Sequence, residues 1–336
     1  MQLRMSDKRL WIGTAISLFF LYLLFRKMDF GQLVAAFRNV DLRYLVAAVL
    51  ASVASFYFRA LRWKFLLLPL KKCSTGTAFS ATSIGLMVNM LFPARLGELA
   101  RTYVLAERET LGKSSVLASV VIDRLADVFS LLVLLIATLF LLDFPSGSVK
   151  ERQALLAGGY TALVVSILVL GFLVALKTGW IKFPAVGSRS IKWLPPRITE
   201  KAGRLVDSFV HGVSLPTRFR HLLAIAMSSF AAWTFSVIPV DLVLRSFGIF
   251  LPISASMFIL VMLAFAVMVP ATPGYIGTYH YACVTALNVF SIPQVQALSV
   301  ALVIHAVSFL PVIVAGFVCL WGAGLTLKEF GKEDQS

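Results

Sequence analysis

The sequence predicts an all-α membrane protein that crosses the bilayer several times, and three features support this prediction. Of the 336 residues, 59% are hydrophobic and only 14% are charged, with a mean hydropathy of +0.87. Soluble globular domains are about one quarter charged. The apolar residues form long continuous runs, without the alternation of a membrane β-barrel. Because the bilayer core offers no water to the backbone, such runs must form helices.

The whole chain, residues 1–336, reads as one integral membrane domain whose first transmembrane helix lies over 10–26. Its basic N-terminus followed by an apolar stretch is similar to a secretory signal peptide. The stretch ends in Phe25, Arg26 and Lys27, however, and no small-residue cleavage site follows. We therefore expect a span that is retained.

The net charge of +15 fits a membrane protein better than a nucleic-acid-binding protein, because the basic residues sit between the apolar runs. The segment over 177–221 reads as a basic cytoplasmic loop, with nine Lys or Arg against two acids between Lys177 and Arg220. A basic N-terminus is also expected in the cytoplasm, although the net positive loop over 26–43 is then placed outside. A second group of basic residues is expected to return the chain to the cytoplasm after the second span. Its members are Arg59, Arg62, Lys64, Lys71 and Lys72.

The order of apolar runs repeats between the two halves of the chain. A span, a hairpin broken by proline and glycine, and a long span occur twice, and Pro93 and Pro273 lie 180 residues apart. If each hairpin enters and leaves on one side, three full crossings separate the two units. The sequence therefore predicts a helical bundle with two inverted repeats, each containing a broken, re-entrant hairpin. The expected segments are repeat 1 over 42–142 with its hairpin over 77–112, a linking span over 154–176, and repeat 2 over 222–325 with its hairpin over 255–291.

The hairpins have a second interpretation. The apolar runs over 77–92, 255–269 and 275–291 are shorter than the roughly 20 residues of a full span. They fit re-entrant helices, but they also fit pairs of short, tilted spans. Interrupted segments at matching positions of two halves are typical of a transporter with its substrate site near the midplane.

The stretch NMLFPARLGELAR, from Asn89 to Arg101, places charges inside the first hairpin. Pro93 disfavours helical geometry at the preceding residue, so one helix should end there and another begin. Arg95, Glu98 and Arg101 follow at three-residue spacing, which lets Glu98 reach an arginine on either side. The remaining positive charge beside a new helix N-terminus suits a phosphate. The alternative is an arginine–glutamate pair with a structural role.

Three further charges, Asp123, Arg124 and Asp127, lie inside the next long span. Asp123 is expected on the order of 12 Å from the start of the apolar run, within the hydrocarbon. Charges at this depth usually face a bundle interior and pair with one another. We expect Asp123 or Asp127 to pair with Arg95 or Arg101, in a contact that either binds substrate or is structural.

The stretch PATPGYIGTYHY supplies the uncharged counterpart in the second hairpin. Gly274 and Gly277 permit a tight turn and close approach of the backbone. Thr272, Tyr275 and His280 offer hydrogen-bond donors, and a histidine titrates near neutral pH. Packing is the alternative role for His280. Two single polar residues in long spans, Asp241 and His305, are expected to be internal hydrogen-bonders.

Several chemistries have no signal in the sequence. It contains no Walker loop, no dinucleotide-binding glycine pattern, no histidine-rich metal cluster and no Gly-x-Ser-x-Gly elbow. The three cysteines are isolated and show no metal-ligand spacing. We therefore expect no cofactor, no metal and no enzymatic activity.

Three motifs resemble the lysylphosphatidylglycerol synthase transmembrane-region family of flippase-like membrane domains. They are N-x-x-x-P-x-R-x-G-E-x-x-R from Asn89, D-R-x-x-D from Asp123 and P-x-x-P-G-x-x-G from Pro270. The resemblance covers almost the whole chain and implies a multi-pass prokaryotic membrane protein that moves lipids or lipid-linked molecules between leaflets. Tyr275 and His280 stand where the family often has glycine and glutamate. The large soluble aminoacyl-transferase domain of the synthases is missing from this sequence, so synthesis of lysyl-lipid is not expected.

Three hypotheses about function follow. The first is a lipid transporter, with membrane lipids as partners, that moves a phospholipid or a lipid-linked anionic substrate across the bacterial inner membrane. The second is a membrane enzyme that transfers a headgroup to a lipid, with Asp123 or His280 as the base. The third is a non-transporting partner of a lipid-synthesis enzyme, and a homo-oligomer is a further option. The candidate substrate-binding residues are Asn89, Arg95, Glu98, Arg101, Asp123, Arg124, Asp127, Thr272, Gly274, Tyr275, Gly277 and His280.

Overall fold

The computed structural model describes residues 40–92, 96–143, 149–178, 207–214, 216–268 and 273–322. These residues form helices and connecting turns, without a strand, so the all-α class predicted from the sequence is confirmed. The first span predicted over 10–26, most of the basic loop over 177–221, and the residues Arg95 and Thr272 lie outside this part of the chain. The elements in chain order are α3 (Leu42–Leu66), α4 (Thr75–Leu91), α5 (Gly97–Glu109), α6 (Lys113–Leu141), α7 (Val149–Lys177), α9 (Phe219–Ser246), α10 (Ile253–Met268), η3 (Pro273–Tyr275), α11 (Thr278–Asn288) and α12 (Gln294–Gly322).

Five of these helices are long and apolar enough to cross a membrane, and the chain is a multi-pass membrane protein by this criterion. Many of their large apolar side chains point outward, Phe140 and Trp321 among the most exposed. Such surfaces suit a lipid environment, because lipid tails are as apolar as these side chains. The five segments are Leu42–Leu66, Lys113–Leu141, Leu155–Leu176, Phe219–Ser246 and Gln294–Gly322.

The first interrupted pair, α4 and α5, breaks where the sequence predicts. Phe92 is extended (φ −119°, ψ 146°), as expected for a residue before proline, and ends α4. The two helices then pack very closely through glycine: a Cβ at Gly85 would lie 2.7 Å from the carbonyl oxygen of Gly97. A side chain at either position would collide with the opposite backbone. This contact fixes α5 against α4.

The second interrupted pair is α10 and α11, which are separated by the short helix η3. Gly274 (φ +71°) and Gly277 (φ +96°) have left-handed backbone conformations that glycine adopts without cost. Tyr275 between them also has a positive φ of 55°. The chain therefore turns sharply here before α11 begins.

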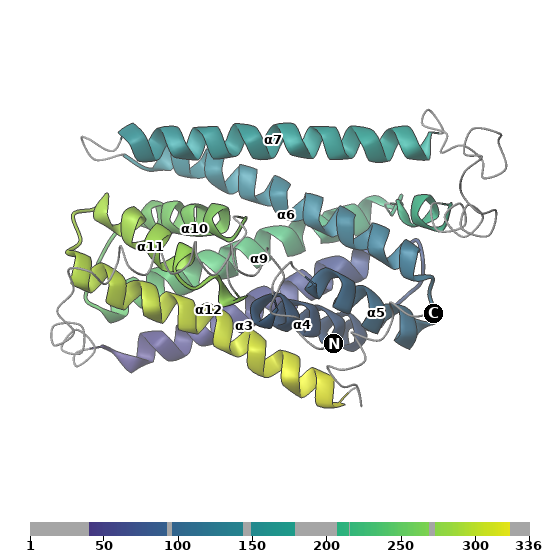
Figure 1. Cartoon of the computed structure of the whole chain (residues 1–336), viewed down its shortest axis with the longest axis horizontal. Helices are drawn as coiled ribbons and strands as arrows, with labels where there is room; N and C mark the ends of the chain where they lie inside the picture. Colours follow the sequence, from purple (N-terminus) through teal and green to yellow (C-terminus); the bar gives the residue numbers. More distant parts are fainter. Residues whose placement is uncertain are drawn as a thin grey trace, which may run out of the picture.

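The two interrupted pairs lie toward opposite ends of the bundle, with α4 and α5 near one end and α10 and α11 near the other (Figure 1). They meet in the interior, where η3 packs against α4. A Cβ at Gly274 would lie 3.9 Å from the carbonyl oxygen of Met90, close to the end of α4. The turn of the second pair thus touches the break of the first.

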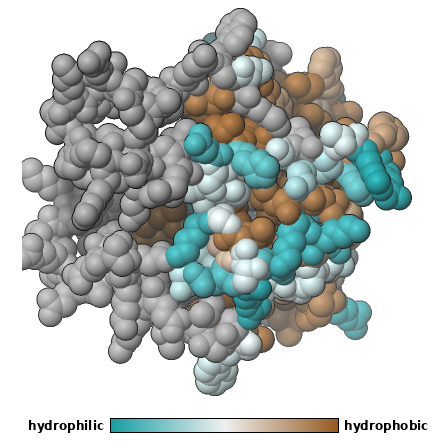
Figure 2. Space-filling model, turned by 90° about the vertical axis from the view of Figure 1, so that its right-hand side faces the viewer, coloured by the Kyte–Doolittle hydropathy of each residue, from teal (hydrophilic) through white to brown (hydrophobic). Residues whose placement is uncertain are grey.

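Figure 2 shows the end of the bundle at which α5 ends and α6 begins, and hydrophilic side chains gather on it. Two ion pairs belong to the connections at this end, Lys71 with Glu109 (3.2 Å) and Lys113 with Glu107 (3.6 Å). A polar cap of this kind is typical of a surface that faces water. It separates one aqueous face from the apolar sides of the bundle.

Candidate functional site

A single buried carboxylate, Asp123 of α6, joins two buried arginines from different helices. Nε of Arg62 on α3 lies 2.8 Å from Oδ1 of Asp123, and Nη2 of Arg101 on α5 lies 2.8 Å from Oδ2. All three side chains are at most 3% exposed. We call Arg62, Arg101 and Asp123 the inner triad. Its three charges are withdrawn from water, so each depends on its partners for stabilisation.

A second group of charges surrounds the inner triad and reaches the surface. Asp127 accepts from Nη1 of Arg59 at 2.7 Å and from Nη1 of Arg124 at 3.1 Å. Glu98 contacts Nε of Arg124 at 3.3 Å through Oε1. We call Arg59, Glu98, Arg124 and Asp127 the outer group. The side chain of Arg124 is 38% exposed and that of Arg59 is 20% exposed, so these arginines are accessible where the triad is not.

The two groups are connected and carry a net positive charge. Asp127 also contacts Nη1 of Arg62 at 2.9 Å, and Glu98 lies 3.7 Å from Nη1 of Arg101. Together the inner triad and outer group contain four arginines and three carboxylates. One positive charge is therefore left uncompensated among the described residues. The Asp123 and Asp127 positions lie about 15 and 21 Å along α6 from its first residue, at the 1.5 Å rise of a helix.

Aromatic rings cover part of the cluster. The guanidinium of Arg101 lies 4.0 Å from the ring centre of Trp63, and that of Arg59 lies 5.3 Å from the ring of Trp233. Trp63 is itself held by a hydrogen bond from its Nε1 to Ser119 (3.1 Å). A ring face attracts a cation, more strongly where water is excluded. The arginines are thus fixed by rings as well as by carboxylates.

Asn89 bridges the break between α4 and α5. Its Oδ1 accepts from the backbone N–H of Gly97 at 2.8 Å, and its Nδ2 lies 3.4 Å from Oε1 of Glu98. The sequence predicts that free N–H groups at this helix start favour an anion. The N–H of Gly97 already has Asn89 as its partner, so this N–H is not available to an anion.

In the second half, polar groups gather at the turn between α10 and α11. Nε2 of His305 lies 2.8 Å from the carbonyl oxygen of Gly274, and the N–H of Gly277 donates to Nδ1 of His280 at 3.4 Å. Asp241 lies elsewhere, with Arg245 (2.6 Å) and Ser256 (3.4 Å) as partners. The prediction that Asp241 and His305 are internal hydrogen-bonders is confirmed.

The structure brings together most of the charged residues that the sequence analysis selected. The expected pairing of Asp123 with Arg101 is confirmed at 2.8 Å. Asp127 instead pairs with Arg59, Arg62 and Arg124, and the position of Arg95 lies outside the described residues. Whether these residues bind a substrate stays a prediction.

Two arginines of the cluster were interpreted wrongly from the sequence. The sequence predicts that Arg59 and Arg62 follow the second span, but α3 continues to Leu66 and carries both on the helix. Arg62 is fully buried, and Arg59 contacts Asp127. Their spacing of three residues on one helix face, opposite two aspartates four residues apart, is the signal that identifies them.

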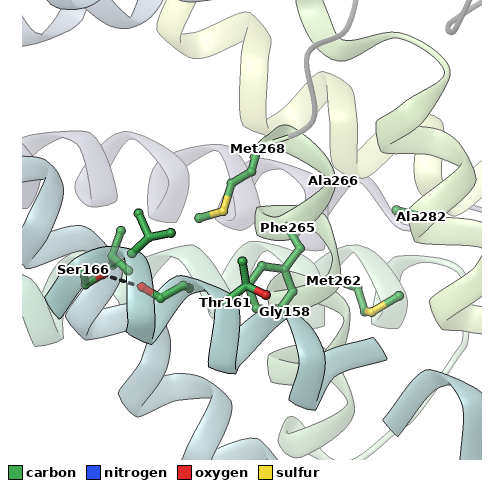
Figure 3. A pocket seen from close by; sticks show the side chains of 11 residues that line it. Gly158, Thr161, Ser166, Met262, Phe265, Ala266, Met268 and Ala282 are labelled. Carbon is green, nitrogen blue, oxygen red and sulfur yellow. Dashed lines mark hydrogen bonds between the residues drawn. The ribbon is translucent and has the colours of Figure 1, made fainter. Parts of the chain in front are cut away.

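A groove of about 550 Å³ lies elsewhere, between α7 and α10. Figure 3 shows Gly158, Thr161 and Ser166 of α7 opposite Phe265 and other apolar side chains of α10. Ser166 donates to the carbonyl of Ala162 on its own helix. Among the described residues, no charged side chain lines this groove, so none of them offers an anion a partner there. The charge cluster is the better candidate site for an anionic group.

The fold and the cluster define a class: a multi-pass helical membrane protein that holds a net positive group of paired charges between its helices. The chain also matches the family model described as the lysylphosphatidylglycerol synthase TM region over residues 10–316. It belongs to this family.

Two kinds of curated relatives are similar to the chain. Glycosyltransferase AglD of Haloferax volcanii is 23% identical over 96% of this chain and 55% of its own length, so the chain spans about half of that protein. UPF0104 membrane proteins of Methanocaldococcus jannaschii (22% identical, 70% of this chain and 94% of the relative) and Methanothermobacter thermautotrophicus (26% identical, 74% and 75%) also match. No solved structure shows a significant match.

The likeness to a protein named a glycosyltransferase corrects one expectation. The absence of a recognisable catalytic motif had suggested that the chain has no enzymatic activity. A relative that matches nearly the whole chain and bears an enzyme's name contradicts that inference.

Proposed function

We propose that the chain binds the anionic headgroup of a phospholipid or lipid-linked substrate at the charge cluster and moves it between leaflets. The observation that supports this most is the excess of one positive charge in a cluster of four arginines and three carboxylates. A phosphate fits this charge and the planar donors of arginine, which bind phosphate oxygens in pairs.

The outer group is the part that meets the headgroup in this proposal. Arg124 and Arg59 are the accessible arginines, and their carboxylate partners Glu98 and Asp127 neutralise them while the site is empty. An arriving phosphate replaces those carboxylates as the acceptor. The inner triad is buried and its charges are paired with one another, so in this proposal it holds the helices in place.

The second interrupted pair supplies the uncharged side of the pathway. The sequence prediction of re-entrant hairpins in two inverted repeats is kept as part of the proposal, and the placement of α4–α5 and α10–α11 toward opposite ends supports it (Figure 1). The contact of Gly274 with the end of α4 supports a pathway that runs from one break to the other. Tyr275, Gly277, His280 and the undescribed Thr272 complete the predicted site.

The proposed setting is the bacterial inner membrane, with a cytoplasmic N-terminus and the hydrophilic end shown in Figure 2 toward the cytoplasm. Membrane lipids are the proposed partners. A lipid-synthesis enzyme is a further proposed partner, and the likeness to AglD, of which this chain spans 55%, supports a role beside a second protein region. A second copy of the chain is also proposed as a partner.

A translocation assay tests the proposal with two matched variants. Arg124 and Arg245 are almost equally exposed (38% and 39%), and each pairs with an aspartate on its own helix. Purified protein is reconstituted in vesicles that contain fluorescent phosphatidylglycerol, and loss of inner-leaflet label is followed after addition of a membrane-impermeant quencher. Arg124→Gln should slow translocation about tenfold or more, since a charge-assisted hydrogen bond is worth roughly 1.5–3 kcal/mol. Arg245→Gln should leave it unchanged. Equal rates for the wild type and Arg124→Gln would sink the site assignment.

A second candidate function is transfer of a headgroup or sugar to a lipid, and the likeness to Glycosyltransferase AglD favours it. Asp123 cannot serve as the base while it is bound to two arginines, and Asp127 is bound to three. Glu98, whose side chain is 22% exposed, is therefore the better acceptor of a proton. Lipid extraction and mass spectrometry after overexpression test this function. A new lipid species that disappears in Glu98→Gln would support transfer, and unchanged lipids would oppose it.

A further inference from the structure

Two histidines meet in the interior beside the turn of the second interrupted pair. The ring centres of His280 on α11 and His305 on α12 lie 4.8 Å apart. His280 is only 5% exposed. His305 is further enclosed by the rings of Tyr279 (5.2 Å) and Phe309 (4.2 Å). The function proposed above gives this pair no separate role.

The hydrogen bonds of the pair show where the protons reside. A carbonyl oxygen only accepts, so Nε2 of His305 carries the hydrogen that it donates to Gly274. Nδ1 of His280 accepts from the N–H of Gly277, so neutral His280 carries its hydrogen on Nε2. That buried Nε2 has no hydrogen-bond partner in the described part of the chain. A buried donor without a partner is costly, and it favours the arrival of an acceptor.

The charge around the pair is low. The helices α4, α10, α11 and α12 contain no Asp, Glu, Lys or Arg. α3 and α9 also pack against α12, but Arg59 and Arg62 of α3 belong to the charge cluster, and Asp241 and Arg245 of α9 pair with each other. The other titratable side chains at the turn are Tyr275, Tyr279 and Cys283.

Because these four helices carry no carboxylate, they offer no negative charge that would stabilise a proton on the pair. One proton gives an uncompensated positive charge in the interior, and a second is opposed by repulsion between the two rings. An anion beside the pair removes the cost of the first proton. Proton binding and anion binding therefore stabilise each other, and the coupling acts equally in both directions.

We infer that His280 and His305 form a second, proton-dependent station for the anionic headgroup. This inference rests on the proposed function and adds that the pair takes up one proton from water as the headgroup arrives and releases it as the headgroup leaves. The route is short: Gly274, which His305 holds, lies beside Met90, and the preceding Asn89 contacts Glu98 of the cluster. The phosphate oxygen is the acceptor for Nε2 of His280.

Translocation of phosphatidylglycerol at several pH values tests the inference. Its phosphodiester stays ionised between pH 5 and 8, so the lipid itself does not titrate. The wild-type rate should rise severalfold as the pH falls from 8 to 5, because protonation of the pair favours the bound anion. The double variant His280→Gln with His305→Gln, which keeps hydrogen-bonding atoms without a proton site, should give equal rates across this range. Arg124→Gln should slow translocation at every pH and keep the wild-type pH profile.

The outcomes separate this inference from the proposed function. Translocation in the wild type that is the same at pH 5 and 8, or a pH profile that persists in the double variant, overturns the proton-dependent site at the histidine pair and leaves the proposed function intact. No translocation at any pH overturns the proposed function.

A second measurement does not depend on the fold of the double variant. The chain contains four histidines, so replacement of His211 and His221 by glutamine leaves only the pair for imidazole nitrogen NMR. At pH 6, addition of phosphatidylglycerol should convert one ring to the imidazolium form, and phosphatidylcholine should leave more of the pair neutral. Two neutral rings in the presence of phosphatidylglycerol would overturn the inference.

Discussion

At the scale of single residues, the cluster combines two kinds of charge. Asp123 neutralises Arg62 and Arg101 away from water, whereas Arg124 and Arg59 remain accessible at the edge. A buried charge that loses its partner is strongly destabilising, and an exposed pair contributes little. The triad is therefore expected to determine stability and the outer group to determine binding.

Replacement of Asp123 by asparagine tests the role of the triad. Two buried arginines lose their shared countercharge, so the free energy of unfolding should fall by about 3–5 kcal/mol. Unfolding of the purified protein in mixed detergent micelles measures the change. Asp241→Asn, which breaks the pair with the more exposed Arg245, is the control and should cost less than Asp123→Asn, because only one arginine loses its partner and that arginine reaches water. A variant of Asp123 as stable as the control would show that the triad is not structural.

The sequence contained part of this site. The pair of Arg101 and Asp123 could be predicted from the sequence, because opposite charges within apolar runs usually pair with one another. Arg62 could not, because a basic residue near the end of an apolar run is also the normal signal for a cytoplasmic loop. Only the observation that α3 continues to Leu66 shows that Arg62 is a buried residue of the helix and not part of a loop. Alanine, leucine, arginine and lysine at the end of α3 are good helix formers, which explains why α3 extends beyond the end of the apolar run.

At the scale of helices, the positions of the breaks in the two interrupted pairs could be predicted from proline and glycine. The close approach of α4 and α5 could not be predicted in this way. The contact between Gly85 and Gly97 joins residues on two different helices, and nothing in the local sequence states which glycine faces which. This approach brings Glu98 and Arg101 of α5 to the charges of α3 and α6. Small residues at a helix interface allow such close packing in membranes.

Gly97→Ala is expected to push α5 away from α4. The new Cβ would collide with the carbonyl oxygen of Gly85 and the side chain of Asn89, so we expect a loss of about 1–3 kcal/mol in stability. Binding of phosphatidylglycerol should weaken as well, because Glu98 and Arg101 move with the helix. Gly171→Ala on α7 is the control, since its Cβ would meet no atom within 4 Å. Unfolding in detergent compares the two, and equal stability would contradict the packing described for α5.

At the scale of the whole molecule, the class of protein was clear from composition, whereas the proposed two-fold relation of its halves still needs a test. The order of spans and breaks repeats in the sequence, and the two interrupted pairs lie toward opposite ends (Figure 1). Local sequence patterns do not reveal whether a short apolar helix belongs to a hairpin that returns to the side it entered from or to a segment that crosses the bilayer. That choice depends on the packing of both halves against each other.

Accessibility of single cysteines distinguishes returning from crossing helices. In a background without native cysteines, Lys72→Cys precedes α4 and Glu107→Cys lies in the last turn of α5. Phe250→Cys precedes α10 and Gln294→Cys follows α11. The proposal predicts that an impermeant maleimide labels the first two from one side of the membrane and the last two from the opposite side. Labelling of Lys72→Cys and Glu107→Cys from opposite sides would mean that α4 and α5 together cross the bilayer.

The central claim is that the accessible arginines of the cluster hold an anionic headgroup, and native mass spectrometry of the protein released from detergent tests it most directly. Equal amounts of phosphatidylglycerol and phosphatidylcholine are offered to the wild type, Arg124→Gln and Arg245→Gln. The account predicts that the wild type and Arg245→Gln retain phosphatidylglycerol in preference, and that Arg124→Gln loses this preference about tenfold. Retention of both lipids in equal amounts by the wild type, or an unchanged preference in Arg124→Gln, would contradict it.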